Sequence, residues 1–290
     1  MSSLSQAPIE IRPVRSLKEC DDFAVLEQMV WQAPPIDALP SHLTWTAIKN
    51  GGGLIAAFSP DGPAETGGMV GATFWFLGVD HATISGAPGP LHVKACSQVA
   101  GVLPAWQGQR IGERLKWAQR DAVLAQGVTD HISWTYDPLL QPNALLNIHK
   151  LGAICNTYFP NHYGDMQDGL NKGMPSDRLQ VDWWLTSPRV LERAAGRVAP
   201  ALLPDEVRLA GHLRSDGLRA PGAVKIPEDG RPLAVPLPTD LAVWRRYDPA
   251  LALAWRLFVR EALQSAFAAG YQIVDFVQMA DAWWYRLRRS

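Results

Sequence analysis

The chain is predicted to be an α+β protein, an α/β/α sandwich in which helices flank a mixed, mostly antiparallel sheet, with a small α+β domain at the C-terminus. Between residues 9 and 185, short extended apolar runs alternate with amphipathic helical stretches. A Ser-Pro-Asp-Gly-Pro segment at residues 59–63 joins two apolar runs, which indicates an antiparallel hairpin. Seven of the 23 prolines then fall between residues 200 and 238, before a last helix and hairpin.

The first 190 residues provide the strands and helices of one domain. Strands are expected at residues 9–14, 54–58, 69–77, 91–103, 131–136, 154–159 and 179–185. Helices are expected at residues 17–30, 39–49, 113–126 and 142–151. Ser16 with Glu19 forms a capping-box pattern before the first helix, and Gly127 and Gly152 end the last two.

The remaining residues form a second, smaller unit. We assign residues 1–190 to the first domain, 191–240 to a proline-rich linker or irregular wrap, and 241–290 to a small α+β domain. Asp248 and Pro249 form an N-cap and first-turn pair before a helix with one continuous apolar face. Residues 271–277 and 283–287 are expected to form a terminal hairpin.

Composition excludes several classes of protein. Of the 290 residues, 47% are hydrophobic and 19% are charged, and no apolar run reaches the ~20 residues of a membrane span. The net charge of −1 gives no support to nucleic-acid binding and favours a small, roughly neutral ligand. The three cysteines are far apart, and no His, Cys and Asp residues have metal-site spacing, so we expect neither disulfides nor a metal. The start of the chain shows no secretory signal, so a cytoplasmic location is expected.

The most informative segment is residues 102–112, Val-Leu-Pro-Ala-Trp-Gln-Gly-Gln-Arg-Ile-Gly. A strand that ends in a glycine-bearing loop and opens directly into a helix offers unpaired backbone N–H groups to a phosphate or pyrophosphate. The GxxxxGK[ST] and GxGxxG nucleotide motifs are absent here. The predicted anion therefore belongs to another class of cofactor.

The run Gln107-Gly108-Gln109-Arg110-Ile111-Gly112 resembles the pyrophosphate loop of the GNAT superfamily of N-acetyltransferases, Gln/Arg-x-x-Gly-x-Gly/Ala. It departs from that pattern at Arg110, where the family usually has glycine. The order of elements over residues 9–185 and the Lys150-Leu151-Gly152 helix end also resemble a complete GNAT domain. The Trp-Thr-Tyr-Asp-Pro stretch at residues 134–138 is similar to that of a branch of predicted acyltransferases with a C-terminal extension and no known substrate.

The resemblance implies that acetyl-CoA or another acyl-CoA is the co-substrate. It assigns acyl-CoA binding to Val102, Leu103, Gln107, Gly108, Gln109, Arg110, Ile111, Gly112, Glu113, Asn143 and Asn147. In the family a main-chain N–H near Val102 would stabilise the oxyanion formed when an amine attacks the thioester. Arg110 is either a phosphate contact or a solvated side chain. Asn143 and Asn147 either border the pantetheine arm or serve capping and surface roles.

Two residues that the family commonly uses in catalysis are missing. The strand at 91–103 contains no Asp or Glu to act as general base, and its polar side chains include His92, Ser97 and Gln98. Ile148 stands where many members place a tyrosine acid. Within the resemblance, the candidate catalytic residues are Tyr158, Tyr163 and Asp137. The alternative for Asp137 is a turn formed with Pro138.

The predicted function is transfer of an acyl group from acyl-CoA to a primary amine of a small molecule or peptide. The alternative is a CoA-binding or interaction module with little catalysis, because the strand glutamate and the helix tyrosine are missing. The C-terminal domain would cover the acceptor side or mediate homodimer formation. Most of the 12 tryptophans are expected to serve packing, with Trp31 and Trp45 as candidates for an aromatic acceptor pocket.

Overall fold

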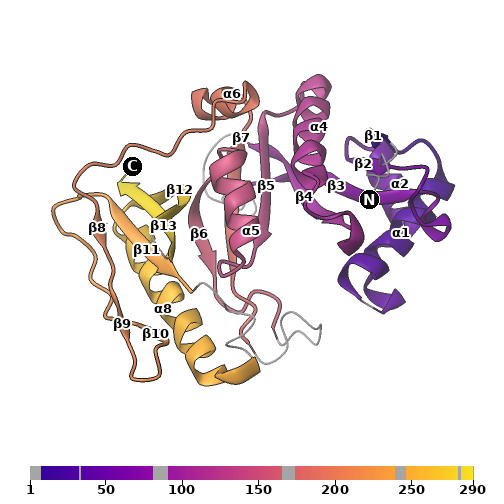
Figure 1. Cartoon of the computed structure of the whole chain (residues 1–290). Helices are drawn as coiled ribbons and strands as arrows, with labels where there is room; N and C mark the ends of the chain where they lie inside the picture. The colour runs from indigo at the N-terminus through magenta and orange to yellow at the C-terminus, as the bar shows by residue number, and fades with distance from the viewer. Residues whose placement is uncertain are drawn as a thin grey trace, which may run out of the picture. The chain divides into compact units, whose positions relative to one another are not determined.

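The computed structural model describes residues 8–32, 34–80, 91–164, 174–238, 246–279 and 282–289. The chain forms two compact units, residues 1–134 and 135–290 (Figure 1). Strand β5 (His131–Tyr136) begins in the first unit and its last two residues belong to the second. The predicted division at residues 190 and 240 is not tested by these packing units and stays a prediction.

The first unit contains a mixed, mostly antiparallel sheet in the order β1-β2-β3-β4-β5. Its strands before β5 are β1 (Glu10–Pro13), β2 (Gly53–Phe58), β3 (Met69–Val79) and β4 (Val93–Val102). The pairs β1/β2, β2/β3 and β3/β4 are antiparallel, and β4/β5 is parallel. The predicted α+β class, with a mixed and mostly antiparallel sheet flanked by helices, is confirmed.

Helices cover both faces of this sheet. A Cβ added at Gly101 would lie 2.6 Å from the ring of Trp31 in α1 (Leu17–Trp31), whereas the side chain of Val102 approaches Gly112 in α4 (Ile111–Gln126). Because successive strand residues point to opposite faces, α1 and α4 lie on opposite sides of β4. Helix α2 (Ser41–Lys49) packs against α1 and against β2 and β3.

The predicted N-terminal cap of α1 is confirmed, with one difference. Ser16 Oγ accepts the N–H of Glu19 at 3.2 Å, as a capping box requires. The Glu19 carboxylate reaches back to the N–H of Arg15 at 2.6 Å rather than to that of Ser16, and it also binds Arg12 at 2.8 Å. The helix start is therefore tied to β1 through Arg12.

The second unit contains strands in the order β7-β6-β12-β13-β11-β8. They are β6 (Ile154–Phe159), β7 (Arg178–Trp184), β8 (Val207–Arg208), β11 (Leu233–Leu237), β12 (Tyr271–Met279) and β13 (Ala282–Arg289). The predicted hairpin of β12 and β13 is confirmed, and β12 pairs with β6 through Ile273 and Cys155. The C-terminal hairpin thus extends the sheet that β6 and β7 begin.

This unit also contains three helical segments. Helix α5 (Gln141–Ala144) continues as a π-helical turn, η4 (Leu145–Lys150), where the sequence predicts one helix to Leu151. A short helix, α6 (Pro188–Ala194), follows β7. The long helix α8 (Pro249–Ala268) begins at Asp248, whose carboxylate accepts the N–H of Leu251, and it packs over β6, β11 and β12.

The proline-rich segment is more ordered than its composition predicts. Residues 233–237 form β11, in which every residue is buried, and β9 (Gly211–Leu213) pairs with β10 (Arg219–Pro221). Pro236 can occupy β11 because β8 pairs only with Leu233 and Ala234, so no neighbour on that side needs its missing N–H. Sequence composition alone therefore overstated the linker character of this segment.

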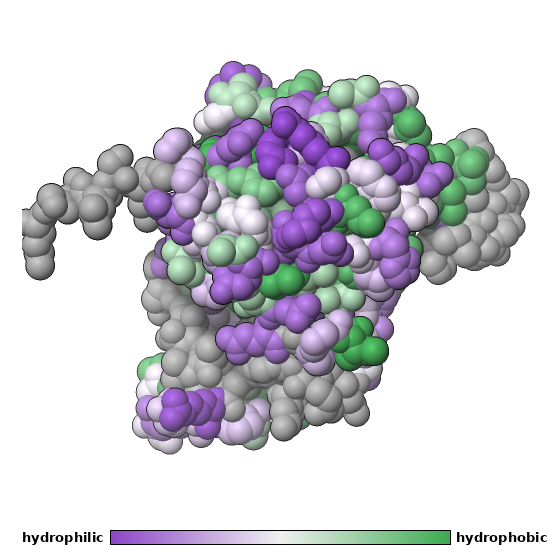
Figure 2. Space-filling model, turned by 90° about the vertical axis from the view of Figure 1, so that its right-hand side faces the viewer, coloured by the Kyte–Doolittle hydropathy of each residue, from purple (hydrophilic) through white to green (hydrophobic). Residues whose placement is uncertain are grey.

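The surface mixes polar and apolar residues. On the face shown in Figure 2, hydrophilic and hydrophobic residues are interspersed over the coloured surface. Among the described residues, no helix combines the length and apolar character needed to cross a membrane.

Candidate functional site

The predicted pyrophosphate loop lies in the first unit, between β4 and α4. The chain leaves β4 at Val102, makes a 3-10 turn at η3 (Pro104–Trp106) and enters α4 at Ile111. Gly108 has φ +80° and Arg110 has φ +60°, so two residues of the loop adopt left-handed backbone. A Cβ at Gly108 would meet no atom within 4 Å, so glycine is needed there for its backbone angle rather than for space.

The N-terminus of α4 keeps amide donors available. The first helical hydrogen bond runs from Arg114 N–H to Arg110 O at 3.0 Å, so the amides of Ile111 and Gly112 precede the helical ladder. The side chain of the N-cap residue, Arg110, does not cap this end of the helix. These donors and the positive end of the helix dipole together suit an anion such as pyrophosphate.

Side chains around the loop are already engaged. Gln107 Nε2 donates to Val102 O at 3.1 Å, which ties the loop to the end of β4. The N–H of buried Leu103 donates to Val70 O at 2.9 Å. The exposed Arg110 guanidinium forms two hydrogen bonds with Glu113, at 2.8 and 3.2 Å. In this structure Arg110 therefore takes the solvated position, paired along the helix.

Strand β4 is irregular just where a cofactor could lie against it. Its pairing with β3 passes from Phe74/Val99 to Trp75/Ser97, which leaves Gln98 as an extra residue in a β-bulge. Its parallel pairing with β5 consists of Ala95 with Ile132 and Cys96 with Ser133, whereas β4 continues to Val102. Beyond Cys96, β4 is therefore no longer paired with the part of β5 that belongs to the first unit.

A buried polar cluster lies at the point where the two strands part. Lys116 Nζ, on α4, is 3.0 Å from Ser97 Oγ and 2.8 Å from Gln119 Oε1, and it lies 3.6 Å from the centre of the Trp134 ring. Gln119 Nε2 also donates to Ser97 Oγ at 3.1 Å. Burial lowers the pKa of Lys116 well below its ordinary value of 10.5. The cluster links α4, β4 and β5 in one network.

Sequence reasoning missed this cluster, although a signal for it exists. Ile111, Leu115 and Val123 form the buried face of α4, and Lys116 and Gln119 fall on the same face at helical spacing. A lysine within an apolar helix face is unusual. The same signal applies to Glu27, which is buried on α1 beside Phe23 and Leu26.

In the second unit, two predicted catalytic residues are held in buried networks. Asp137 forms a bidentate ion pair with Arg256 of α8, at 2.6 and 2.8 Å, and accepts the N–H of Leu139 at 2.8 Å. Tyr158 Oη donates to Asp177 Oδ2 at 2.6 Å. Burial and this hydrogen bond raise the pKa of Tyr158. Both side chains therefore have the contacts of framework residues.

The carboxylate of Asp177 is the centre of the second of these networks. It accepts two hydrogen bonds from Arg260 of α8, at 2.7 and 2.9 Å, and one from the N–H of Asn161 at 2.9 Å. Burial raises the pKa of Asp177, but the hydrogen bonds from Arg260 and Tyr158 outweigh it and hold that pKa below its ordinary value. Helix α8 is therefore fastened by Arg256 and Arg260 to the ends of β5, β6 and β7.

Tyr163 differs from the other two predicted catalytic residues because 52% of it is exposed. Its hydroxyl lies 3.2 Å from Thr135 Oγ1 and its ring lies 5.1 Å from the Arg178 guanidinium. Asn143 is exposed at the start of α5, whereas Asn147 is buried in η4, where its carbonyl accepts the N–H of Ala153 at 3.1 Å. The loop after Gly164 falls outside the described residues until Met174.

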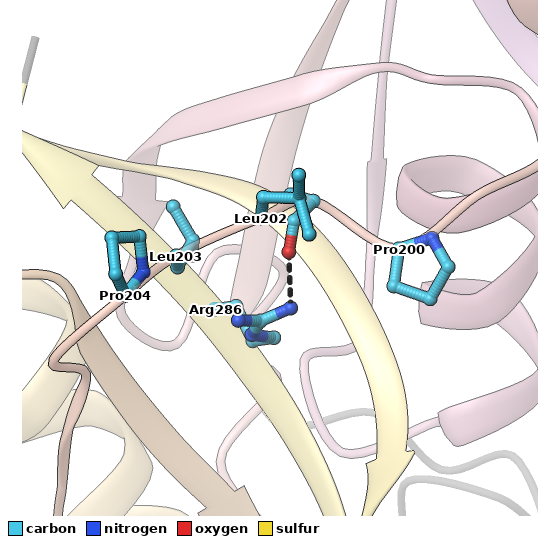
Figure 3. Close-up of a pocket in the computed structure, with 6 residues that line it drawn as sticks. Pro200, Leu202, Leu203, Pro204 and Arg286 are labelled. Carbon is cyan, nitrogen blue, oxygen red and sulfur yellow. Dashed lines mark hydrogen bonds between the residues drawn. The ribbon is translucent and has the colours of Figure 1, made fainter.

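An open groove of about 580 Å³ lies on the second unit (Figure 3). Residues 200–204 line it together with Arg286, whose Nη1 donates to Ala201 O at 2.6 Å. None of the predicted site residues lines this groove. Within the described ranges, no three His, Cys, Asp or Glu side chains gather as a metal site would require.

No protein-family model and no curated protein matches the chain. Similar solved structures include Arabidopsis thaliana NAA60 in complex with a bisubstrate analogue, at 12% identity and a TM-score of 0.46 over 61% of this chain and 98% of that one. The ribosomal-protein-S18-alanine N-acetyltransferase from Escherichia coli is 14% identical, with a TM-score of 0.43 over 60% of this chain and 92% of that one. A GNAT-family acetyltransferase from Streptococcus pneumoniae is 13% identical, with a TM-score of 0.45 over 60% and 98%. The structural neighbours are GNAT N-acetyltransferases, the resemblance predicted from sequence, and they leave an extra C-terminal region of this chain.

Proposed function

We propose that this protein is an acyltransferase that moves an acetyl or other acyl group from acyl-CoA to a primary amine of a small molecule or peptide. The observation that carries the proposal is the combination, within one unit, of an uncapped helix N-terminus after a left-handed loop and a bulged strand that parts from its parallel neighbour. The first feature suits a pyrophosphate, and the second suits an extended, amide-bearing arm. Coenzyme A carries both groups in one molecule.

The residues that would hold acyl-CoA follow from this geometry. The amides of residues 108–112 would bind the pyrophosphate, and Gly108 would let the ligand approach the backbone closely. The edge of β4 over residues 97–102 would bind the pantetheine arm, because that edge continues past the pairing with β5. The Arg110 side chain would reach a phosphate only by leaving Glu113, so we assign no direct contact to its guanidinium.

When bound, acyl-CoA supplies an activated acyl carbon, and the protein has to stabilise the charge that develops on the carbonyl oxygen. The β-bulge at Gln98 lies in the pairing with β3 and bends β4. On the opposite edge, the pairing with β5 ends at Cys96, so main-chain N–H groups of β4 beyond that point would be the donors to the thioester oxygen. The buried Lys116 cluster fixes Ser97, the residue before the bulge. The backbone of β4 is therefore preorganised to donate a hydrogen bond to an oxyanion.

Two of the predicted catalytic residues receive other roles in this proposal. Asp137 and Tyr158 hold α8 to the strand ends of its own unit, Asp137 through Arg256 and Tyr158 through the Asp177 network. Tyr163, which is half exposed, stays a candidate catalytic residue. Tyr163→Phe tests this role. Loss of a catalytic hydroxyl should lower turnover, and because the side chain is half exposed, its loss should leave stability unchanged.

Calorimetric titration with acetyl-CoA, followed by a thiol-release assay over a panel of amines, tests the proposed function. We expect one saturable site per chain and thiol release that depends on both enzyme and amine. One observation favours the alternative, a CoA-binding module. Strand β4 has no Asp or Glu, and the residue at its bulge, Gln98, carries an amide, which cannot act as a general base. Binding without turnover on any amine would favour the module, and absence of binding would refute both.

A further inference from the structure

We infer that Glu27 is the proton acceptor for the amine that attacks the acyl group. This inference rests on the proposed function and assigns the general base that β4 does not supply. The observations that carry it are the position of Glu27 on α1, its burial with no charged partner among the described residues, and the contact that α1 makes with β4.

The two faces of β4 are covered by different helices. The face of β4 that bears Ser97 is filled by Lys116 and Gln119 of α4. The opposite face is bordered by α1, because Gly101 lies against the Trp31 ring and Val30. We therefore place the acceptor on the α1 side of the strand, where no buried polar network is attached to β4 within the described residues.

Glu27 lies on that side, one helical turn before the contact with β4. Residues 27 and 31 are four apart, so their side chains are neighbours on one face of α1. Trp31 is 37% exposed while its ring touches the position of Gly101, so it forms a wall between the strand and solvent. Glu27 is 6% exposed and lies beside this wall.

The surroundings of the Glu27 carboxylate are suited to proton transfer. Oε2 accepts the N–H of Leu39 at 3.0 Å, and this is the carboxylate's one hydrogen bond within the described residues. Burial raises the pKa of Glu27 to about 7, and the Leu39 N–H lowers it only in part. No charged side chain of α1, α2, β3 or β4 in the described ranges contributes to that pKa. A group that titrates near neutral pH accepts and releases protons efficiently.

A purely structural role explains these observations less well. A buried carboxylate without a cation destabilises the folded protein, and a glutamine could accept the Leu39 N–H at no such cost. A glutamate at this position therefore points to its charge state being used.

The amine nitrogen forms a C–N bond with the thioester carbon and gives one proton to Glu27, directly or through a water. The C–S bond then breaks, and its electron pair leaves with sulfur. Return of the proton from Glu27 to the thiolate or to solvent regenerates the carboxylate, so the products are an amide and free CoA thiol.

Glu27→Gln is the test variant and Asp21→Asn is its control, because Asp21 is an exposed carboxylate on the same helix. Glutamine keeps an acceptor for Leu39, so the variant should fold. We expect kcat to fall about 100-fold in Glu27→Gln. The Kd for acetyl-CoA should stay within twofold in both variants, and Asp21→Asn should keep wild-type kcat.

The pH dependence of kcat separates a proton acceptor from a structural residue. Wild type and Asp21→Asn should lose activity below an apparent pKa of about 7, and this limb should not move between two amines of different basicity. The limb should be absent in Glu27→Gln and retained in Glu27→Asp, which also keeps the assignment testable if the glutamine variant unfolds. Wild-type kcat and an intact limb in Glu27→Gln would overturn the inference alone. A wild-type protein that binds acetyl-CoA but acylates no amine would overturn it together with the proposed function.

Discussion

Gly108 and Gly127 form a matched pair of positions that isolates the pyrophosphate loop. Both have left-handed backbone, with φ +80° and +69°, and a Cβ at either one would meet no atom within 4 Å. Gly108 precedes the N-terminus of α4 and Gly127 caps its C-terminus. Glutamate at either site therefore adds the same charge and the same backbone strain to opposite ends of one helix.

Both substitutions should lower the free energy of unfolding only slightly, and Gly108→Glu should not be the less stable of the two variants. A non-glycine residue in left-handed backbone costs about 1 to 2 kcal/mol, and this applies to both variants. A carboxylate is favourable near a helix N-terminus and unfavourable near a C-terminus, by about 0.3 to 1 kcal/mol. Gly127→Glu should thus be equally stable or less stable in denaturant unfolding.

The effect on binding should be large only at Gly108. A carboxylate roughly 5 Å from a phosphate charge at an effective dielectric of about 20 gives about 3 kcal/mol of repulsion, and salt reduces it to about 1.5 to 3 kcal/mol. The Kd for acetyl-CoA should therefore rise about 10- to 100-fold in Gly108→Glu and stay within twofold in Gly127→Glu, as measured by calorimetry. Equal Kd values for the two variants would refute the placement of the loop.

Three further outcomes follow from buried groups. The lowered pKa of Lys116 makes the free energy of unfolding of the wild type rise as pH increases toward 10.5. Lys116→Met should lose this rise, as measured by denaturant unfolding at several pH values. The same rise of unfolding free energy with pH in both proteins would contradict this. Tyr158→Phe should lose about 1 to 2 kcal/mol of stability, since Asp177 loses one donor, while turnover stays within twofold; a large fall in kcat at unchanged stability would restore Tyr158 as a catalytic residue. The raised pKa of Glu27 contributes stability that is complete below pH 4.5 and is lost as pH rises through about 7. The free energy of unfolding of the wild type should therefore fall by about 3 kcal/mol over that range. This fall should be absent in Glu27→Gln, as measured by denaturant unfolding at several pH values.

Local patterns in the sequence were enough to predict most elements of the fold. The extended runs at residues 131–136 and 154–159 predicted β5 and β6 at the observed bounds. Gly127 ends α4 in left-handed backbone as its position after the apolar pattern suggested. These features depend on neighbours within one or two turns, which a single sequence displays.

Features that depend on distant partners could not be predicted in this way. Arg256 pairs with Asp137 across 119 positions, and Arg260 pairs with Asp177 across 83. No residue near Asp137 in the sequence therefore indicated that its carboxylate is paired with an arginine. The bulge at Gln98 is a property of the register with β3 and leaves no residue signature of its own. The polar residues at buried helix positions, Lys116 and Glu27, carried a signal that helical periodicity alone makes visible.

The central claim is that backbone amides at the start of α4 hold the pyrophosphate of acyl-CoA. The most direct measurement is an amide-resolved NMR titration of the labelled protein with acetyl-CoA, in which the resonances of Gly108 and Gly112 report on the loop and that of Gly127 serves as an internal control. We predict large, saturable shifts of the Gly108 and Gly112 amides, with the Gly127 amide unchanged. Unchanged Gly108 and Gly112 amides at saturating acetyl-CoA would contradict the claim.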